Sequence, residues 1–131
     1  MRAIGKDCRV DRVYHSVPPT ERTARFMATS VTEATFQDEV LASETPVIVD
    51  FWAEWCGPCH AVEPVLNQIV EERNVKLVKV NIDEEQGLAQ RYGIMSIPTV
   101  ILFEGGEPAT SATGAYPKRL LEQQLWPEAV A

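Results

Sequence analysis

Two cysteines separated by two residues, Cys56 and Cys59, are the side chains with the clearest chemistry in this chain. They follow an apolar, β-branched run at Val47–Val49, and the residues between them are Gly57 and Pro58. A helix that begins near Cys56 offers unpaired backbone N–H groups and the positive end of its dipole, which favour a thiolate. Because the thiolate is the nucleophile, the pattern predicts thiol–disulfide exchange, with a partly exposed Cys56 that attacks and a more buried Cys59 that resolves.

The same two cysteines admit two other interpretations. A structural zinc site needs a second pair of ligands, and no other cysteine is nearby in the sequence. The segment from Cys56 to His60 also fits the Cys-x-x-Cys-His pattern of c-type haem attachment. A haem site, however, needs export and a second axial ligand. We therefore expect no metal and no cofactor other than a redox-active disulfide between Cys56 and Cys59.

Asp50 lies inside the apolar strand that precedes the cysteines. A buried carboxylate is costly unless it has a partner or a function. The position of Asp50, six residues before Cys56, therefore makes it a second candidate for the site.

Six short segments around these residues match one pattern in order and spacing. They are Val49–Cys59, Glu63-Pro64, Lys79–Asp83, Tyr92–Thr99, Phe103–Gly106 and Gly114-Ala115. Together they make the stretch from Val47 to about Leu125 resemble the thioredoxin family. The resemblance implies the thioredoxin α/β fold, with a central mixed β-sheet flanked by helices on both faces.

The resemblance also implies an activity and the residues that perform it. The expected activity is that of a protein dithiol–disulfide oxidoreductase, which reduces disulfides of client proteins and maintains thiol redox balance. In the family, Asp50 would lie beneath the second cysteine and take part in proton transfer, with Lys79 as its buried partner. A purely structural ion pair between Asp50 and Lys79 is the alternative interpretation. Gly57 and Pro58 form the turn between the thiols, a dipeptide typical of reductants in the family.

A docking surface for the client follows from the same resemblance. Ile97 and Pro98 match the family's cis-proline loop, whose backbone pairs with an extended substrate strand. The expected apolar docking surface consists of Trp55, Gly57, Pro58, Ile97, Gly114 and Ala115. His60 departs from the Lys or Arg that the family usually has after the second cysteine. It is either a solvated surface residue or a source of pH dependence in the redox potential.

The elements that must position these residues follow from hydrophobic periodicity and from the prolines and glycines. The predicted order is β-α-β-α-β-α-β-β-α. Strands are expected at 28–31, 47–51, 75–82, 99–103 and 108–113. Helices are expected from Thr32 or Thr35 to Leu41, and over 56–73, 84–92 and 117–126. Pro64 is expected to kink the long helix, and Pro108 requires an edge strand.

The distribution of charge predicts a boundary near Met27. Residues 1–26 have six basic and three acidic side chains, whereas residues 27–131 have six and sixteen. We expect an N-terminal extension over 1–26, either disordered or the product of an upstream start codon, and a thioredoxin domain over 27–131. The extension has no apolar core of a secretory signal. Cys8 within it is expected to be an exposed thiol without a role, or else a regulatory or dimerising one.

Composition limits the partners. A net charge of −7 argues against general nucleic-acid binding, and no apolar run approaches the length of a membrane helix. We expect a cytoplasmic monomer that meets client proteins and a thioredoxin reductase, usually a flavoprotein that draws on NADPH. An oxidase or isomerase in an oxidising compartment and a non-enzymatic scaffold subunit are the alternative functions.

Overall fold

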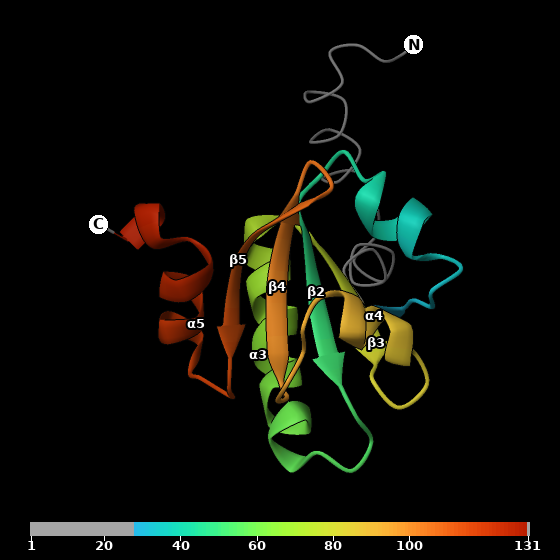
Figure 1. Cartoon of the computed structure of the whole chain (residues 1–131). Helices are drawn as coiled ribbons and strands as arrows, with labels where there is room; N and C mark the ends of the chain where they lie inside the picture. Colours follow the sequence, from blue (N-terminus) through green and yellow to red (C-terminus); the bar gives the residue numbers. More distant parts are fainter. Residues whose placement is uncertain (1–27, 131) are drawn as a thin grey trace, which may run out of the picture.

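The computed structural model describes residues 28–130, in which strands and helices alternate in the predicted order (Figure 1). The strands are β1 (Thr29–Ser30), β2 (Val47–Trp52), β3 (Lys76–Asn81), β4 (Thr99–Glu104) and β5 (Glu107–Thr113). The helices are η1 (Gln37–Leu41), α3 (Gly57–Arg73), α4 (Gln86–Arg91), α5 (Lys118–Leu125) and a short η2 (Pro127–Val130) that was not predicted. The predicted extension over 1–26, the boundary at Met27 and Cys8 lie outside the described residues.

The strands form one mixed sheet in the order β1-β3-β2-β4-β5. β1, β3 and β2 run parallel, whereas β4 and β5 are antiparallel to their neighbours. β2 is in the centre and its first five residues are buried, as expected for a strand covered on both faces. β5 is at the edge, which confirms the position required by Pro108.

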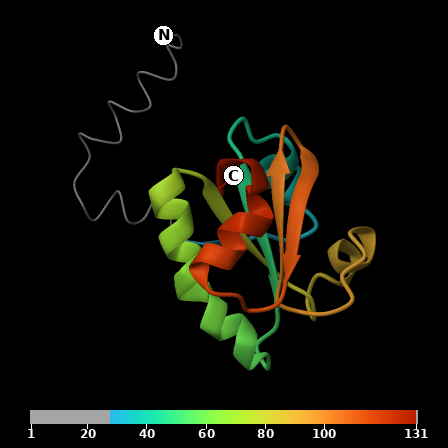
Figure 2. The same ribbon diagram turned by 90° about the vertical axis from the view of Figure 1, so that its left-hand side faces the viewer.

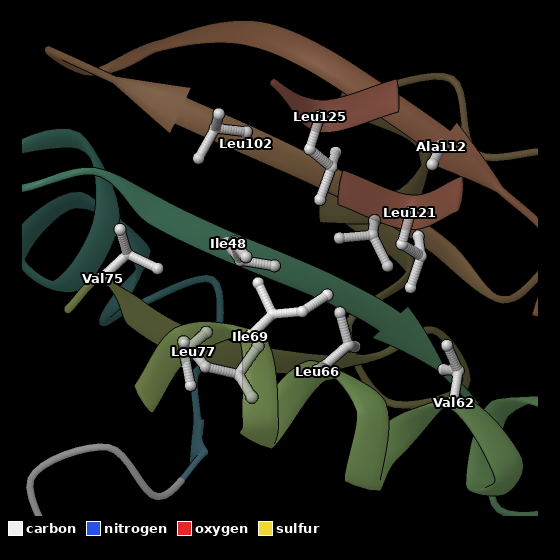
Figure 3. Packing of buried hydrophobic residues seen from close by; sticks show 12 residues of the cluster. Ile48, Val62, Leu66, Ile69, Val75, Leu77, Leu102, Ala112, Leu121 and Leu125 are labelled. Carbon is white, nitrogen blue, oxygen red and sulfur yellow. The ribbon is translucent and has the colours of Figure 1, made fainter. Parts of the chain in front are cut away.

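Helices cover both faces of the sheet, which confirms the predicted fold class. α3 and α5 pack on one face, and η1 and α4 lie on the opposite face (Figure 2). Under α3 and α5, Ile48, Leu66 and Leu121 are fully buried within one apolar cluster (Figure 3). Burying each such side chain contributes about 1.5–3 kcal/mol. This packing fixes α3, and with it the cysteines at its N-terminal end, against the central strand.

The helix boundaries have local causes. α3 continues through Pro64 and ends at Asn74, whose left-handed conformation (φ 59°) stops the helix. The predicted cap of the first helix by a threonine is confirmed at Thr32, whose hydroxyl accepts the backbone N–H of Thr35 at 3.3 Å and whose carbonyl accepts the N–H of Phe36 at 2.9 Å. The hydroxyl of Thr35 in turn accepts the backbone N–H of Thr32 at 2.9 Å, so the two residues form a capping box. The turn that the two threonines cap leads directly into η1, because the N–H of Glu39 donates to the carbonyl of Thr35 at 2.9 Å.

The hairpin turn between β4 and β5 offers a test of the fold. Gly105 and Gly106 have positive φ angles of 62° and 82°. A Cβ atom on Gly106 would lie 2.7 Å from the backbone oxygen of Leu41, whereas a Cβ atom on Gly105 meets open space. We expect Gly105→Ala to lower the free energy of unfolding by about 1 kcal/mol and Gly106→Ala by about 2–3 kcal/mol. Urea unfolding measures both, and equal losses would contradict the close approach to Leu41.

Candidate active site

The two cysteines lie at the junction of β2 and α3 and are joined by a disulfide. β2 ends at Trp52, and after a short turn Cys56 is the N-cap residue of α3. The Cα atoms of Cys56 and Cys59 are 5.3 Å apart, a separation that a disulfide spans without displacing the backbone. Pro58 falls in the first turn of the helix, where a missing N–H removes no helical hydrogen bond.

The sulfur of Cys56 takes part in capping the helix. Its Sγ accepts a hydrogen bond from the backbone N–H of Cys59 at 3.2 Å. This is the place that a side-chain oxygen occupies in an ordinary N-cap. In the reduced protein the same N–H group and the helix dipole favour negative charge on this sulfur.

Both cysteines are buried. Cys56 is 4% exposed and Cys59 is 2% exposed. The prediction of a partly exposed Cys56 is therefore wrong for the disulfide form. The reason is packing, because both residues form a small cluster with Ala53, against which Trp52 and Ile97 also pack.

Asp50 is a buried carboxyl in the middle of β2, at 1% exposure. Burial raises the pKa of Asp50 from 3.8 to about 7, while the charge of Lys79 lowers this pKa and that of Glu63 raises it. Its Oδ1 atom has no hydrogen-bond partner among residues 28–130. A carboxyl group that titrates near neutral pH can both take up and release a proton there.

Lys79 lies opposite Asp50 in the adjacent parallel strand, but its ammonium group pairs elsewhere. The Nζ atom of Lys79 donates to Oε2 of Glu63 at 2.8 Å and lies 4.1 Å from the centroid of the Trp52 ring. Among the described residues the expected ion pair between Asp50 and Lys79 is thus not formed. The physical reason is desolvation: the Glu63 side chain is 34% exposed and keeps its charge at lower cost than a fully buried carboxyl.

Trp55 stands out from the surface beside the cysteines. Its side chain is 69% exposed, and its indole Nε1 donates to Oδ2 of Asp83 at 2.9 Å. The hydrogen bond restrains the ring without covering it. Trp55 therefore offers a fixed, exposed apolar face next to Cys56.

The loop at Ile97-Pro98 lies beside the disulfide. The peptide bond between these two residues is cis, as the resemblance implied. Ile97 packs against the cysteine cluster, and the N–H of Gly114 donates to the carbonyl of Pro98 at 2.8 Å. The structure thus joins this loop and the segment after β5 to the cysteines. Of the other expected members of the docking surface, Gly57, Pro58 and Ala115 are exposed.

His60 is exposed but has defined contacts. Its Nε2 atom donates to the carbonyl oxygen of Glu54 at 2.9 Å. Its ring meets the Trp52 ring edge-on, with centroids 5.9 Å apart. His60 therefore connects the first turn of α3 to the turn that precedes it.

Two further residues of the site had no role in the sequence analysis: Glu63 and Asp83. Glu63 follows Cys59 by four residues, so the helical repeat places it on the same face, and this signal was available. The contact of Asp83 with Trp55 spans 28 residues and has no local signal. Met95, which the sequence marks as a variant position of the proline loop, is 95% exposed.

In residues 28–130, no group of three or more His, Cys, Asp or Glu side chains is placed to hold a metal ion. No helix in this part of the chain has the length and apolar character needed to cross a membrane.

Comparisons with known proteins agree with one another. The family model Thioredoxin matches residues 27–126. Thioredoxin 1 of Nostoc sp. is 51% identical over 100 residues, which cover 75% of this chain and 94% of that protein. Thioredoxin 1 of Synechococcus elongatus is 50% identical over 76% of this chain and 94% of its own length. Thioredoxin of Streptomyces clavuligerus is 50% identical over 70% of this chain and 87% of its own length.

The raised pKa of Asp50 predicts how stability changes with pH. From about pH 4 to about pH 7 the unfolded chain ionises at Asp50 while the folded protein keeps the proton, so stability falls as pH rises. We expect Asp50→Asn to have little effect at pH 4 and to raise the free energy of unfolding at pH 8. The gain is at most about 4 kcal/mol, at about 1.4 kcal/mol per pKa unit.

Urea unfolding of the disulfide-bonded protein measures this effect. Asp38→Asn removes an exposed carboxylate on η1 and serves as the control for a change of net charge. A gain from Asp50→Asn that is equal at pH 4 and pH 8, or no larger than that of the control, would contradict the buried carboxyl.

Proposed function

The chain belongs to the thioredoxin family and is a protein dithiol–disulfide oxidoreductase, and we propose that it reduces client disulfides with Cys56 as the attacking thiol. One observation supports this assignment above the others. The Sγ atom of Cys56 accepts the backbone N–H of Cys59 at the start of α3. Helix N-termini favour the thiolate, which is the reactive form.

The proposed cycle consists of two exchanges. The Cys56 thiolate attacks one sulfur of a client disulfide, which forms a mixed disulfide and releases the other client sulfur as a thiolate. Cys59 then loses its proton and attacks the sulfur of Cys56, which forms the internal disulfide and releases the second client sulfur. Two electrons pass from the two thiols to the client. The disulfide described above is the oxidised end of this cycle.

Asp50 is proposed as the group that accepts the proton of Cys59. Its support is burial together with a pKa of about 7, which suits a group that must take up and release a proton near neutral pH. Lys79 belongs to the proposed site as the positive charge that lowers this pKa.

The client is proposed to bind as an extended strand along the backbone of Ile97, with Pro98 shaping that loop. The surrounding docking surface consists of Trp55, Gly57, Pro58, Ile97, Gly114 and Ala115. Support comes from the exposed face of Trp55 and from the hydrogen bond between Gly114 and Pro98. Recognition through backbone atoms favours many different clients.

Each turnover leaves the protein oxidised, so the proposal includes a thioredoxin reductase as electron donor. The two thiols of the reduced protein carry the electrons, and the proposed chemistry uses no bound cofactor. We place the activity in the cytoplasm, where reducing conditions suit a disulfide reductant. The proposal further includes a monomer, with the thioredoxin domain over 27–131 and an extension over 1–26.

Cysteine and aspartate variants test the division of roles. All are made in a Cys8→Ser background, in which Cys56 and Cys59 are the two remaining cysteines. With a disulfide-bonded protein substrate such as insulin, we expect Cys59→Ser to accumulate a covalent complex and Cys56→Ser to form none. We expect Asp50→Asn to retain the attack but to slow release of the complex about 100-fold, the scale of one general base. Mass spectrometry and stopped-flow kinetics measure these steps. A complex in Cys56→Ser would reverse the assignment of the two thiols.

A redox titration of Cys56 and Cys59, followed by the fluorescence of the nearby tryptophans, tests the direction of electron flow. We expect a reduction potential below that of the glutathione couple, because the proposal is a reductant. A potential well above that couple would assign the protein to oxidative folding.

A further inference from the structure

Glu63 occupies a place in the site that the proposed function does not use. It lies on α3 one turn beyond Cys59, on the same helix face. Across from it, Ile48 and Leu77 point to the α3 side of the sheet. Since strand side chains alternate, Asp50 and Lys79, two residues further along their strands, point to that side as well.

This arrangement leaves one ammonium group between two carboxyl groups. Asp50 and Lys79 are register partners in adjacent strands, so an ion pair between them requires no change in the backbone. The ammonium group instead lies 2.8 Å from Oε2 of Glu63. It also lies over the ring of Trp52, at 4.1 Å from the centroid. Oδ1 of Asp50 is left without a hydrogen-bond partner among residues 28–130.

We propose that Glu63 is a positioning residue for thiol–disulfide exchange, which holds the Lys79 ammonium group against Trp52 and away from Asp50. The Asp50 carboxyl then forms no ion pair with Lys79 and can exchange a proton with its surroundings. This inference rests on the proposed proton-accepting role of Asp50. Glu63 touches no reacting atom and acts through Lys79.

The charges around Asp50 determine in which direction the pKa of Asp50 changes when Glu63 is lost. Lys79 on β3 lowers the pKa of Asp50, and Glu63 on α3 raises it. The register partner of Asp50 on β4 is the uncharged Val100, and its neighbours on β2, Val49 and Phe51, are also uncharged. In the oxidised protein the cysteines at the start of α3 do not titrate. Loss of Glu63 therefore lowers the pKa of Asp50 for two reasons. It removes a negative charge, and it releases the ammonium group of Lys79.

The test is a pH titration of Asp50 in the full-length oxidised protein, by NMR of carboxyl-¹³C-labelled aspartate. The Asp50→Asn variant identifies the resonance. We expect a midpoint near 7 in the wild type and a midpoint about one unit lower or more in Glu63→Ala. Glu63→Gln keeps an oxygen that can accept from Lys79, so we expect a smaller shift from it.

Two controls separate the effect of where Glu63 lies from the effect of losing any carboxylate of α3. Glu72→Ala removes another carboxylate of α3, one that pairs with Lys118 at 2.9 Å, and we expect no shift from it. Adding Lys79→Met to Glu63→Ala removes the released ammonium group, and we expect the midpoint to rise again. An unchanged midpoint in Glu63→Ala, or equal shifts in Glu63→Ala and Glu63→Gln, overturns the proposal.

The titration is independent of turnover, so it separates this inference from the proposed function. In the reduced protein we expect the pH profile of the resolving step to move in Glu63→Ala to the same extent as the Asp50 midpoint. If Asp50→Asn resolves the mixed disulfide at the wild-type rate, the proton-accepting role fails. In that case the titration still decides whether Glu63 holds Lys79 away from Asp50.

Discussion

The N-terminus of α3 is the constraint on which the rest of the structure depends. A helix leaves its first N–H groups without partners, and here one of them bonds to the sulfur of Cys56. That end must stay in place, and it does so because β2 is buried on both faces and the apolar side of α3 packs on it. The disulfide, the flanking Trp55 and the proline loop are all positioned relative to this one junction.

A buried carboxyl next to that junction is the main cost of the arrangement. Asp50 loses hydration, which disfavours its charged form and moves its titration toward neutral pH. An ion pair with Lys79 would recover part of this cost but would hold the carboxyl ionised. The observed pairing of Lys79 with Glu63 leaves this cost in place, which is consistent with the proton-accepting role proposed for Asp50.

Much of the fold could be predicted from local patterns. The apolar run of β2, the long helix after Cys56 and the Gly105-Gly106 hairpin each have signals within a few residues, and all three are found. The errors fell where partners distant in sequence compete for a group. Lys79 pairs with Glu63 instead of Asp50. Cys56 is buried because Ile97, some forty residues later, packs against its cluster.

The sequence by itself determined the chemistry of this protein, since two thiols at this spacing, with glycine and proline between them at a helix start, suit disulfide exchange. It also determined the order of strands and helices, because hydrophobic periods and turn residues act over short distances, and the fold class followed from the resemblance to the thioredoxin family. Only the tertiary structure decided which carboxylate receives the Lys79 ammonium group and how deeply Cys56 is buried. Both depend on the packing of α3 against the sheet. Small differences in distance and in desolvation there decide which of two possible partners a group contacts, and the sequence does not distinguish these partners.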